Sequence, residues 1–134
     1  MKTLEVVCGI IRDDKGYLIA RRKSKVHNDI WEFPGGKVEA NETQEEAIVR
    51  ELKEELNLTC KVESYLTSIV DQRSDLCIHV HAYICEKVSG TLQNHAHHEI
   101  RFVSLEELYT YAFEPCDRAI MDALKVYEQT HGND

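Results

Sequence analysis

The segment GGKVEANETQEEAIVRELKEELNL, which spans residues 35–58, carries the strongest structural pattern in the chain. Thr43 followed three residues later by Glu46 is a capping box, which predicts that a helix begins here. Apolar residues then recur every four positions and predict a stripe facing the core: Ile48, Leu52 and Leu56. Because Asn tolerates left-handed backbone, we expect the helix to end at Asn57.

The second half of this helix carries three carboxylates on one face, offset from the apolar stripe: Glu51, Glu54 and Glu55. Like charges at this spacing repel, and the dipole near the end of a helix disfavours anions. We expect Arg50 and Lys53, which offset part of the charge, to project elsewhere. A divalent cation such as Mg²⁺ would relieve the repulsion, because it takes carboxylate, water and phosphate oxygens as ligands. Spacing alone leaves two interpretations open, a metal site and a solvated acidic face.

The rest of the chain reads as strands followed by shorter helices. Apolar, β-branched runs predict strands at residues 4–11, 17–20, 60–70, 76–85 and 100–103. Residues 34–36 (PGG) predict a chain reversal. Ser104 and Glu107 predict a short second helix, and a last helix follows the turn at 115–117. This order predicts an α/β fold in which a mixed β-sheet is sandwiched between helices.

Length, charge and cysteine content narrow the class of protein. The chain has 134 residues, which suits a single domain over residues 1–134. Its net charge of −8 argues against a nucleic-acid polymer as partner. The apolar runs are too short to span a bilayer and the start lacks a signal peptide, so we expect a cytoplasmic protein without membrane attachment. Five cysteines without a CxxC pair predict reduced thiols.

The segment around the acidic helix resembles the Nudix box, a pattern of glycine, glutamates and one arginine at fixed spacing. The matching residues are Gly36, Glu42, Arg50, Glu51, Leu52, Glu54, Glu55 and Leu58. Asn57 departs from the pattern, since the family has glycine there, but both residues suit the end of a helix. The resemblance implies the Nudix fold, an α/β/α sandwich.

Other segments resemble the MutT-type branch of this family, which hydrolyses nucleoside triphosphates. They are the opening strand, the Arg21-Arg22 pair and residues 32–37. Residues 89–93 and the turn at 115–117 resemble the CTP pyrophosphohydrolases of this branch. The resemblance implies a hydrolase that converts a (deoxy)nucleoside 5′-triphosphate to monophosphate and pyrophosphate by attack of water at the β-phosphorus, with Mg²⁺ or Mn²⁺.

The resemblance leaves the substrate open. CTP or a modified pyrimidine triphosphate is the first expectation. The alternatives among enzymes are 8-oxo-dGTP, a nucleotide sugar or a dinucleotide. A non-catalytic nucleotide-binding module is the alternative from another class. The expected partner is in each case a small nucleotide, and we expect a monomer or a homodimer.

The resemblance assigns metal binding and catalysis to the acidic helix and the turn before it. The implied metal ligands are a backbone carbonyl of Gly36 and the carboxylates of Glu51, Glu54 and Glu55. The implied catalytic group is Arg50, Glu51 and Glu54, with Glu51 as ligand, as general base or as both. Glu42 would orient Arg50, or would simply be an acid placed favourably near the helix start.

Three basic residues and one acidic residue are implied to bind the substrate. Arg22, with Arg21, would meet the phosphates, since guanidinium groups match phosphate oxygens, and Lys37 is a weaker candidate. The alternative for the arginines is an exposed strand end. Asp117 would contact the base, ionised against cytosine or protonated against an oxidised purine. Its alternative, which does not exclude this contact, is an N-cap of the last helix.

Two features depart from the family or stand outside it. Ala96 occupies the position of a further metal-binding glutamate, and either Glu99 or a nearby histidine is open as its replacement. A zinc site can be drawn from six residues: Cys77, His79, His81, His95, His97 and His98. None has a recognised zinc spacing, so packing or pocket lining is the favoured interpretation, and a zinc-binding interaction domain is the remaining alternative for the function of the chain. For Trp31 and Phe33, base stacking and core packing both remain open.

Overall fold

The computed structural model describes residues 1–26 and 29–131, so residues 27–28 and 132–134 of the expected 1–134 domain lie outside the described residues. The strands are β1 (Lys2–Asp13), β2 (Gly16–Arg21), β3 (Trp31–Glu32), β4 (Gly35–Lys37), β5 (Leu58–Gln72), β6 (Leu76–Gly90) and β7 (Glu99–Val103). The helices are α1 (Gln44–Leu56), α2 (Leu105–Leu108) and α3 (Arg118–His131), with a 3-10 turn η1 (Pro115–Asp117) before α3. All five predicted strands and the predicted helices are present.

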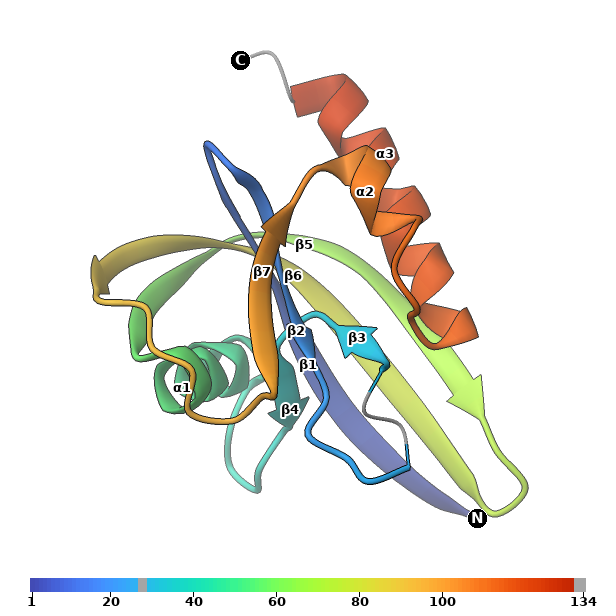
Figure 1. Cartoon of the computed structure of the whole chain (residues 1–134). Helices are drawn as coiled ribbons and strands as arrows, with labels where there is room; N and C mark the ends of the chain where they lie inside the picture. Colours follow the sequence, from blue (N-terminus) through green and yellow to red (C-terminus); the bar gives the residue numbers. More distant parts are fainter. Residues whose placement is uncertain (27–28, 132–134) are drawn as a thin grey trace.

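The sheet is mixed, as predicted, and β1 is its central strand (Figure 1). The main order is β3-β2-β1-β6-β5, with β4 paired to β1 and β7 paired to β2. β1 and β6 run parallel, from Lys2 opposite Leu76 to Ile11 opposite Cys85, while the other pairs are antiparallel. The chain reversal expected at residues 34–36 is wrong for the glycines, because Gly35 and Gly36 continue as β4 against Cys8 and Val7.

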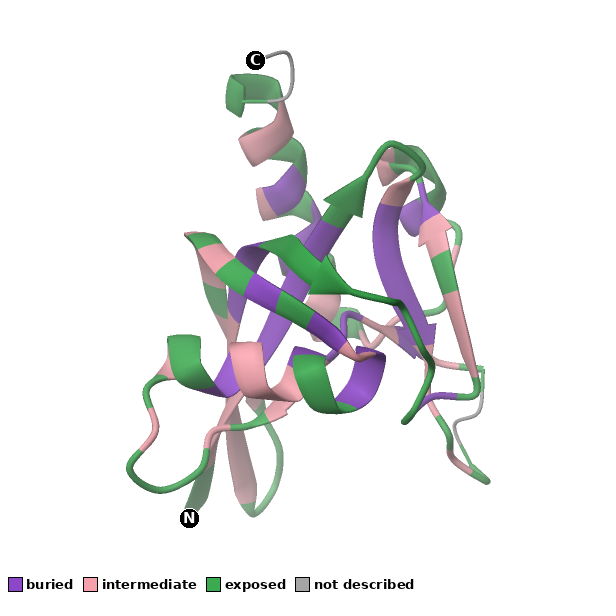
Figure 2. Ribbon diagram, turned by 90° about the vertical axis from the view of Figure 1, so that its left-hand side faces the viewer, coloured by how far each residue is buried: buried purple, intermediate pink, exposed green. Residues whose placement is uncertain are grey.

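Local sequence determines α1 as expected. The Thr43 hydroxyl accepts from the Glu46 amide, the Glu46 carboxylate accepts from the Thr43 amide, and Asn57 ends the helix with φ 60°. The apolar stripe is fully buried against the sheet (Figure 2). A side chain at Gly9 would stand 3.1 Å from Leu52 Cδ1, so this glycine allows the helix to lie close on β1.

Two cores lie on opposite faces of the sheet. One packs α1 against β1 and β6, and the other packs α2 and α3 against β1, β2 and β6 (Figure 1). The α/β/α sandwich is therefore confirmed. Trp31 and Phe33 are buried in the second core, where they meet Tyr111 and Phe113, which confirms core packing for both.

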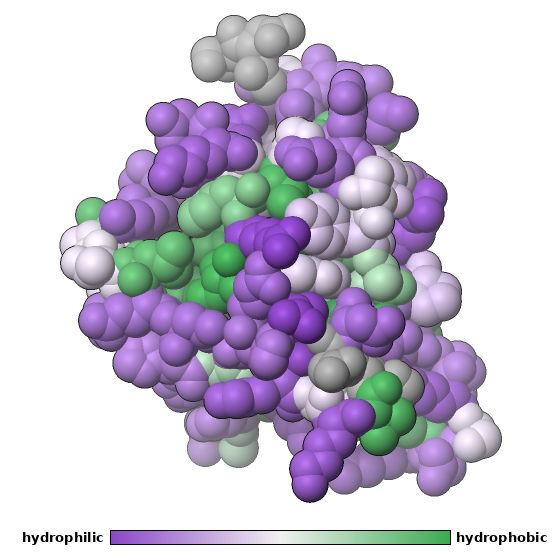
Figure 3. All heavy atoms as spheres, in the orientation of Figure 1, coloured by the Kyte–Doolittle hydropathy of each residue, from purple (hydrophilic) through white to green (hydrophobic). Residues whose placement is uncertain are grey.

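The surface is mostly hydrophilic and the cysteines are unpaired, as the composition predicts. Hydrophilic residues cover most of the face in Figure 3, with smaller hydrophobic areas between them. All five cysteines are free, as predicted. None of the helices in residues 1–26 and 29–131 is long and apolar enough to cross a membrane.

Candidate active site

The Glu51 carboxylate lies directly over the backbone of β4. A Cβ atom added to Gly36 would stand 2.5 Å from Glu51 Oε1 and 2.7 Å from Oε2, so glycine is what leaves room for this carboxylate. α1 presents Glu51 here because its apolar stripe packs on the sheet and its acidic face is offset from that stripe. The structure thus brings Glu51 and Gly36 together, as the expected site requires.

Arg50 joins the carboxylates instead of projecting elsewhere, so that expectation was wrong. Its Nε donates to Glu42 Oε2 at 2.7 Å, and its Nη1 donates to Glu51 and Glu54, both at 3.0 Å. Its Nη2 donates to the backbone carbonyl of Lys37 at 3.0 Å. A guanidinium group offers five donors on a long side chain, so one arginine can satisfy acceptors on several sides. The repulsion among the acids is therefore partly relieved without a cation.

Glu54 and Glu55 stand in different environments although they are adjacent in sequence. The Glu54 side chain is 55% exposed and directs both oxygens to Arg50. Glu55 is 8% exposed. Burial and the neighbouring Glu51 carboxylate raise the pKa of Glu55 to about 9. This carboxyl therefore keeps its proton at neutral pH when no cation is present.

The donor set fits a hard divalent cation in composition but is not preassembled. Carboxylate and backbone oxygens are the ligands that Mg²⁺ prefers, and a cation could replace the proton of Glu55. In the described part of the chain, however, no group of three or more His, Cys, Asp or Glu side chains is arranged to hold a metal as it stands. Glu54 is paired with Arg50 instead.

His97 is the residue of the 93–98 loop that reaches the acidic helix. Its side chain is only 5% exposed, with Nε2 2.9 Å from Glu32 Oε2 and 3.7 Å from Glu55 Oε1. Asn94 fixes the loop by accepting from the His97 amide and donating to the His97 carbonyl. Glu99 instead pairs with Arg21 and Arg101. Among the candidates that the sequence left open beside Ala96, which were Glu99 and the nearby histidines, His97 is therefore the one at the carboxylates.

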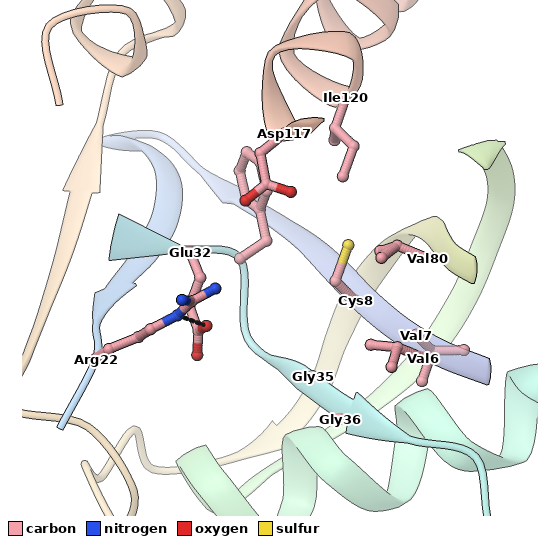
Figure 4. Close-up of a pocket in the computed structure, with 11 residues that line it drawn as sticks. Val6, Val7, Cys8, Arg22, Glu32, Gly35, Gly36, Val80, Asp117 and Ile120 are labelled. Atoms are coloured by element: carbon pink, nitrogen blue, oxygen red, sulfur yellow. Dashed lines mark hydrogen bonds and ion pairs between the residues drawn. The ribbon is translucent and has the colours of Figure 1, made fainter. Parts of the chain in front are cut away.

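A cavity of about 180 Å³ opens beside this cluster (Figure 4). Its lining includes Gly35 and Gly36 at one end and Asp117 and Ile120 at the other, with Cys8, Arg22, Glu32 and Phe33 among the residues between. Arg22 is held there by two carboxylates, with Nε 2.8 Å from Glu32 Oε1 and Nη1 2.9 Å from Glu114 Oε1. A cationic side chain in a partly apolar cavity suits an anionic group attached to a flat ring.

Asp117 projects into this cavity from the turn before α3 (Figure 4). Burial, together with the carboxylates of Glu32 and Glu114 and against the opposing effect of Arg22, raises its pKa to about 6. Among the described residues, no backbone amide of α3 donates to the Asp117 carboxylate, so the N-cap alternative is wrong. Its carboxyl group is available to a ligand in either protonation state near neutral pH.

The other expected phosphate-binding residues lie outside the cavity lining. Arg21 pairs with Glu99 and lies near the ring of Trp31. Lys37 is exposed at the end of β4 and offers its carbonyl to Arg50. Sequence reasoning missed the contribution of Glu32. The pattern that could have identified Glu32 is an acidic residue between two aromatic residues, Trp31 and Phe33, directly before the Pro-Gly-Gly segment. Both aromatic residues are buried in the structure.

Comparisons with known proteins agree with this geometry. The family model described as NUDIX domain matches residues 2–124. The CTP pyrophosphohydrolase of Escherichia coli K12 is 40% identical over 124 residues, which cover 92% of each chain. The 8-oxo-dGTP diphosphatase of the same organism is 33% identical over 127 residues, covering 93% of this chain and 98% of its own.

Solved structures show the same architecture. The solution structure of the E. coli ORF135 protein superposes with a TM-score of 0.89 at 38% identity, covering 100% of this chain and 96% of its own. The crystal structure of a MutT protein from Methanosarcina mazei Go1 gives a TM-score of 0.79 at 22% identity, covering 96% and 95%. At that identity the second match supports the fold alone.

Proposed function

This chain belongs to the NUDIX domain family, and we propose that it hydrolyses a (deoxy)nucleoside 5′-triphosphate, with CTP or a modified pyrimidine triphosphate as the preferred substrate. The products are the nucleoside monophosphate and pyrophosphate. One observation carries the proposal: the cavity that contains Arg22 and Asp117 ends at Gly36, the residue over which the Glu51 carboxylate lies. A base beside Asp117 would extend its phosphates toward the acidic helix.

The preference for a pyrimidine rests on Asp117 and on the relatives. An ionised carboxylate only accepts hydrogen bonds, and the exocyclic amine of cytosine donates them. The cavity, at about 180 Å³, is also small. The E. coli CTP pyrophosphohydrolase resembles this chain along nearly its whole length, which supports the same choice.

We propose Mg²⁺, or Mn²⁺ in its place, as the cofactor, held by Glu51, Glu54, Glu55 and the backbone carbonyl of Gly36. When bound, such a cation neutralises phosphate charge and lowers the pKa of a coordinated water. Glu55 would give up its proton on binding, because its pKa of about 9 belongs to the cation-free state. Glu54 would exchange one of its contacts with Arg50 for the cation.

Glu51 is proposed as the general base. It accepts a proton from the water that attacks the β-phosphorus. The bond from that phosphorus to the oxygen shared with the α-phosphorus then breaks, and this oxygen leaves with the monophosphate. Arg50 is a positioning residue in this scheme, because its contacts at 3.0 Å to Glu51 and 2.7 Å to Glu42 hold the base against β4.

Arg22 is proposed to bind a phosphate by exchanging partners. In the structure its guanidinium is paired with Glu32 and Glu114. A phosphate presents oxygens of the same geometry and more charge, so it can replace one carboxylate. His97, which is 2.9 Å from Glu32, would keep the released Glu32 carboxylate in place.

An oxidised purine triphosphate such as 8-oxo-dGTP is the second candidate substrate. The pKa of about 6 for Asp117 favours it, because a carboxyl that titrates near neutral pH can also donate a hydrogen bond. The 33% identity to an 8-oxo-dGTP diphosphatase points the same way. We further propose a cytoplasmic location, which the free thiols support.

A substrate panel with saturating Mg²⁺ tests this function. It compares pyrophosphate release from CTP, a modified dCTP, 8-oxo-dGTP and ADP-ribose, with the monomer or homodimer state checked by light scattering. The highest kcat/KM should belong to a pyrimidine triphosphate, and Glu54→Gln should abolish turnover without loss of fold. Absence of pyrophosphate from every triphosphate would leave a non-catalytic nucleotide-binding module as the answer. Full turnover by Glu54→Gln would instead remove Glu54 from the catalytic group.

A further inference from the structure

A second group of chemically reactive side chains lies on the α1 face of the sheet, outside the lining of the cavity. Glu5 on β1 and His79 on β6 are direct neighbours in the parallel pairing, and His81 follows two residues later opposite Val7. Residues two apart on a strand face the same side. All three side chains therefore meet over two adjacent strands.

The Glu5 carboxylate bridges the two imidazole rings. His79 Nδ1 is 2.8 Å from Glu5 Oε2, and His81 Nε2 is 2.7 Å from Glu5 Oε1. The ring centroids are 6.5 Å apart and the rings are nearly perpendicular. Exposed fractions of 38% for His79, 15% for His81 and 42% for Glu5 leave the group open to ions from solvent.

The second nitrogen of His81 is also provided with a partner. Ser68 Oγ on β5 lies 2.6 Å from His81 Nδ1, and Tyr65 OH lies 2.7 Å from the same hydroxyl. A histidine that binds a metal through one nitrogen usually donates its other N–H to such an oxygen, which fixes the ring and its tautomer. Ser68 therefore supplies the outer contact that a metal-binding His81 requires.

We propose that Glu5, His79 and His81 form a binding site for a divalent transition metal ion of the zinc class. Two imidazole nitrogens and one carboxylate oxygen are a common ligand set for Zn²⁺, with the fourth position left to water. Imidazole ligands suit Zn²⁺, Cu²⁺ and Ni²⁺, whereas Mg²⁺ selects oxygen ligands only. This site is thus chemically separate from the carboxylates of α1.

The cation replaces the hydrogen bonds between the rings and Glu5. An ionised carboxylate only accepts, so the two nitrogens facing Glu5 carry protons in the structure. On metal binding each neutral imidazole moves its proton to the other nitrogen, where that of His81 is donated to Ser68. An imidazolium would instead release one proton to solvent.

The location explains why sequence spacing did not identify the site. The pattern HVH supplies two ligands from one strand, and the third comes from Glu5, which is 74 positions before His79. Cys77, which was grouped with these histidines from sequence, makes no hydrogen bond to them in the described chain. A carboxylate on the neighbouring strand completes the set instead.

Zinc titration of the whole protein tests this inference. Binding of ZnCl₂ is measured by calorimetry and equilibrium dialysis in excess Mg²⁺, which occupies the catalytic carboxylates. Wild-type protein and Glu54→Gln should both bind one Zn²⁺ per chain, and bound Co²⁺ should give the visible spectrum of a nitrogen-containing site. His79→Ala and His81→Ala should each weaken binding by at least tenfold, and Glu5→Gln should weaken it as well.

Matched controls distinguish this site from other histidines. His95→Ala and His131→Ala remove exposed rings elsewhere and should leave zinc binding unchanged. Circular dichroism verifies folding, and the more exposed His79 carries the test if His81→Ala does not fold. No stoichiometric zinc in the presence of Mg²⁺, equal binding by His79→Ala, or loss in His95→Ala would each overturn the proposal. None of these readouts depends on nucleotide hydrolysis.

Discussion

Replacing Gly36 with Ala should impair catalysis while the fold is retained. The added Cβ would stand 2.5 Å from Glu51 Oε1, whereas ordinary contact begins at 3.4 Å, so the carboxylate must move by about 0.9 Å (3.4 − 2.5). The moving atoms are the end of a flexible side chain, so the free energy of unfolding should change little. A misplacement of about 1 Å in a catalytic group costs roughly 100-fold in rate. We therefore expect kcat to fall by about two orders of magnitude.

The assay measures pyrophosphate release at saturating Mg²⁺ with the best substrate of the panel, together with the Tm by circular dichroism. Gly36→Ala should lower kcat far more than it raises KM, because the contacts proposed for Arg22 with phosphate and for Asp117 with the base are untouched. Its Tm should remain within a few degrees of the wild-type value. This separation of rate from stability is the diagnostic result.

Gly35→Ala is the matched control. Its Cβ would stand 2.0 Å from the backbone oxygen of Val7, which cannot move without separating β4 from β1. This variant should therefore lose thermal stability as well as activity. The reasoning is refuted if Gly36→Ala keeps kcat within threefold of wild type, or if it loses as much Tm as Gly35→Ala.

Three further predictions follow from the same site. Arg50→Lys keeps the positive charge but loses the guanidinium group that donates to both Glu42 and Glu51, so the free energy of unfolding in urea should fall by about 1–3 kcal/mol and kcat should fall as well. An unchanged free energy of unfolding and kcat would contradict the positioning role. Without metal, Glu55 keeps its proton in the folded state, whereas the unfolded state loses it above pH 4.5, so this carboxyl destabilises the fold progressively up to a pH of about 9. Added Mg²⁺ should therefore raise the Tm more near pH 8.5 than near pH 6. An equal rise in Tm at both pH values would argue against metal binding at Glu55. Asp117→Asn removes a carboxylate that lines the cavity, so the ratio of kcat/KM for CTP over 8-oxo-dGTP should fall by about tenfold, the value of one charged hydrogen bond; an unchanged ratio would remove Asp117 from base selection.

Elements determined by local sequence were predictable. α1 begins at a capping box, buries a four-residue apolar repeat and ends at Asn57, and each of these signals lies within the helix or one residue beyond it. The five longer strands were equally evident from their apolar runs. β3 and β4 were not, because two or three residues become a strand only through pairing with β2 and β1.

Contacts between distant segments limited how much of the candidate site could be predicted from the sequence. The spacing of the acidic helix identified Glu51, Glu54 and Glu55, but it did not give the direction of Arg50, whose acceptors lie on α1, on the preceding loop and on β4. His97 meets Glu32 across 65 positions, so no local pattern relates them. Asp117 was identified only through resemblance, and its cavity required the fold.

The parallel pairing of β1 with β6 has a consequence for how the protein is made. Lys2 pairs with Leu76, 74 positions later, so the central strand leaves the ribosome long before its partner does. Pairings this distant in sequence form slowly, since the intervening loop must first be closed. The Gly36-to-Leu58 segment is complete earlier, but the loop that carries His97 and the turn that carries Asp117 are synthesised after β6. The nascent chain therefore contains its acidic helix first, and the cavity lined by Arg22 and Asp117 can be completed only near the end of synthesis.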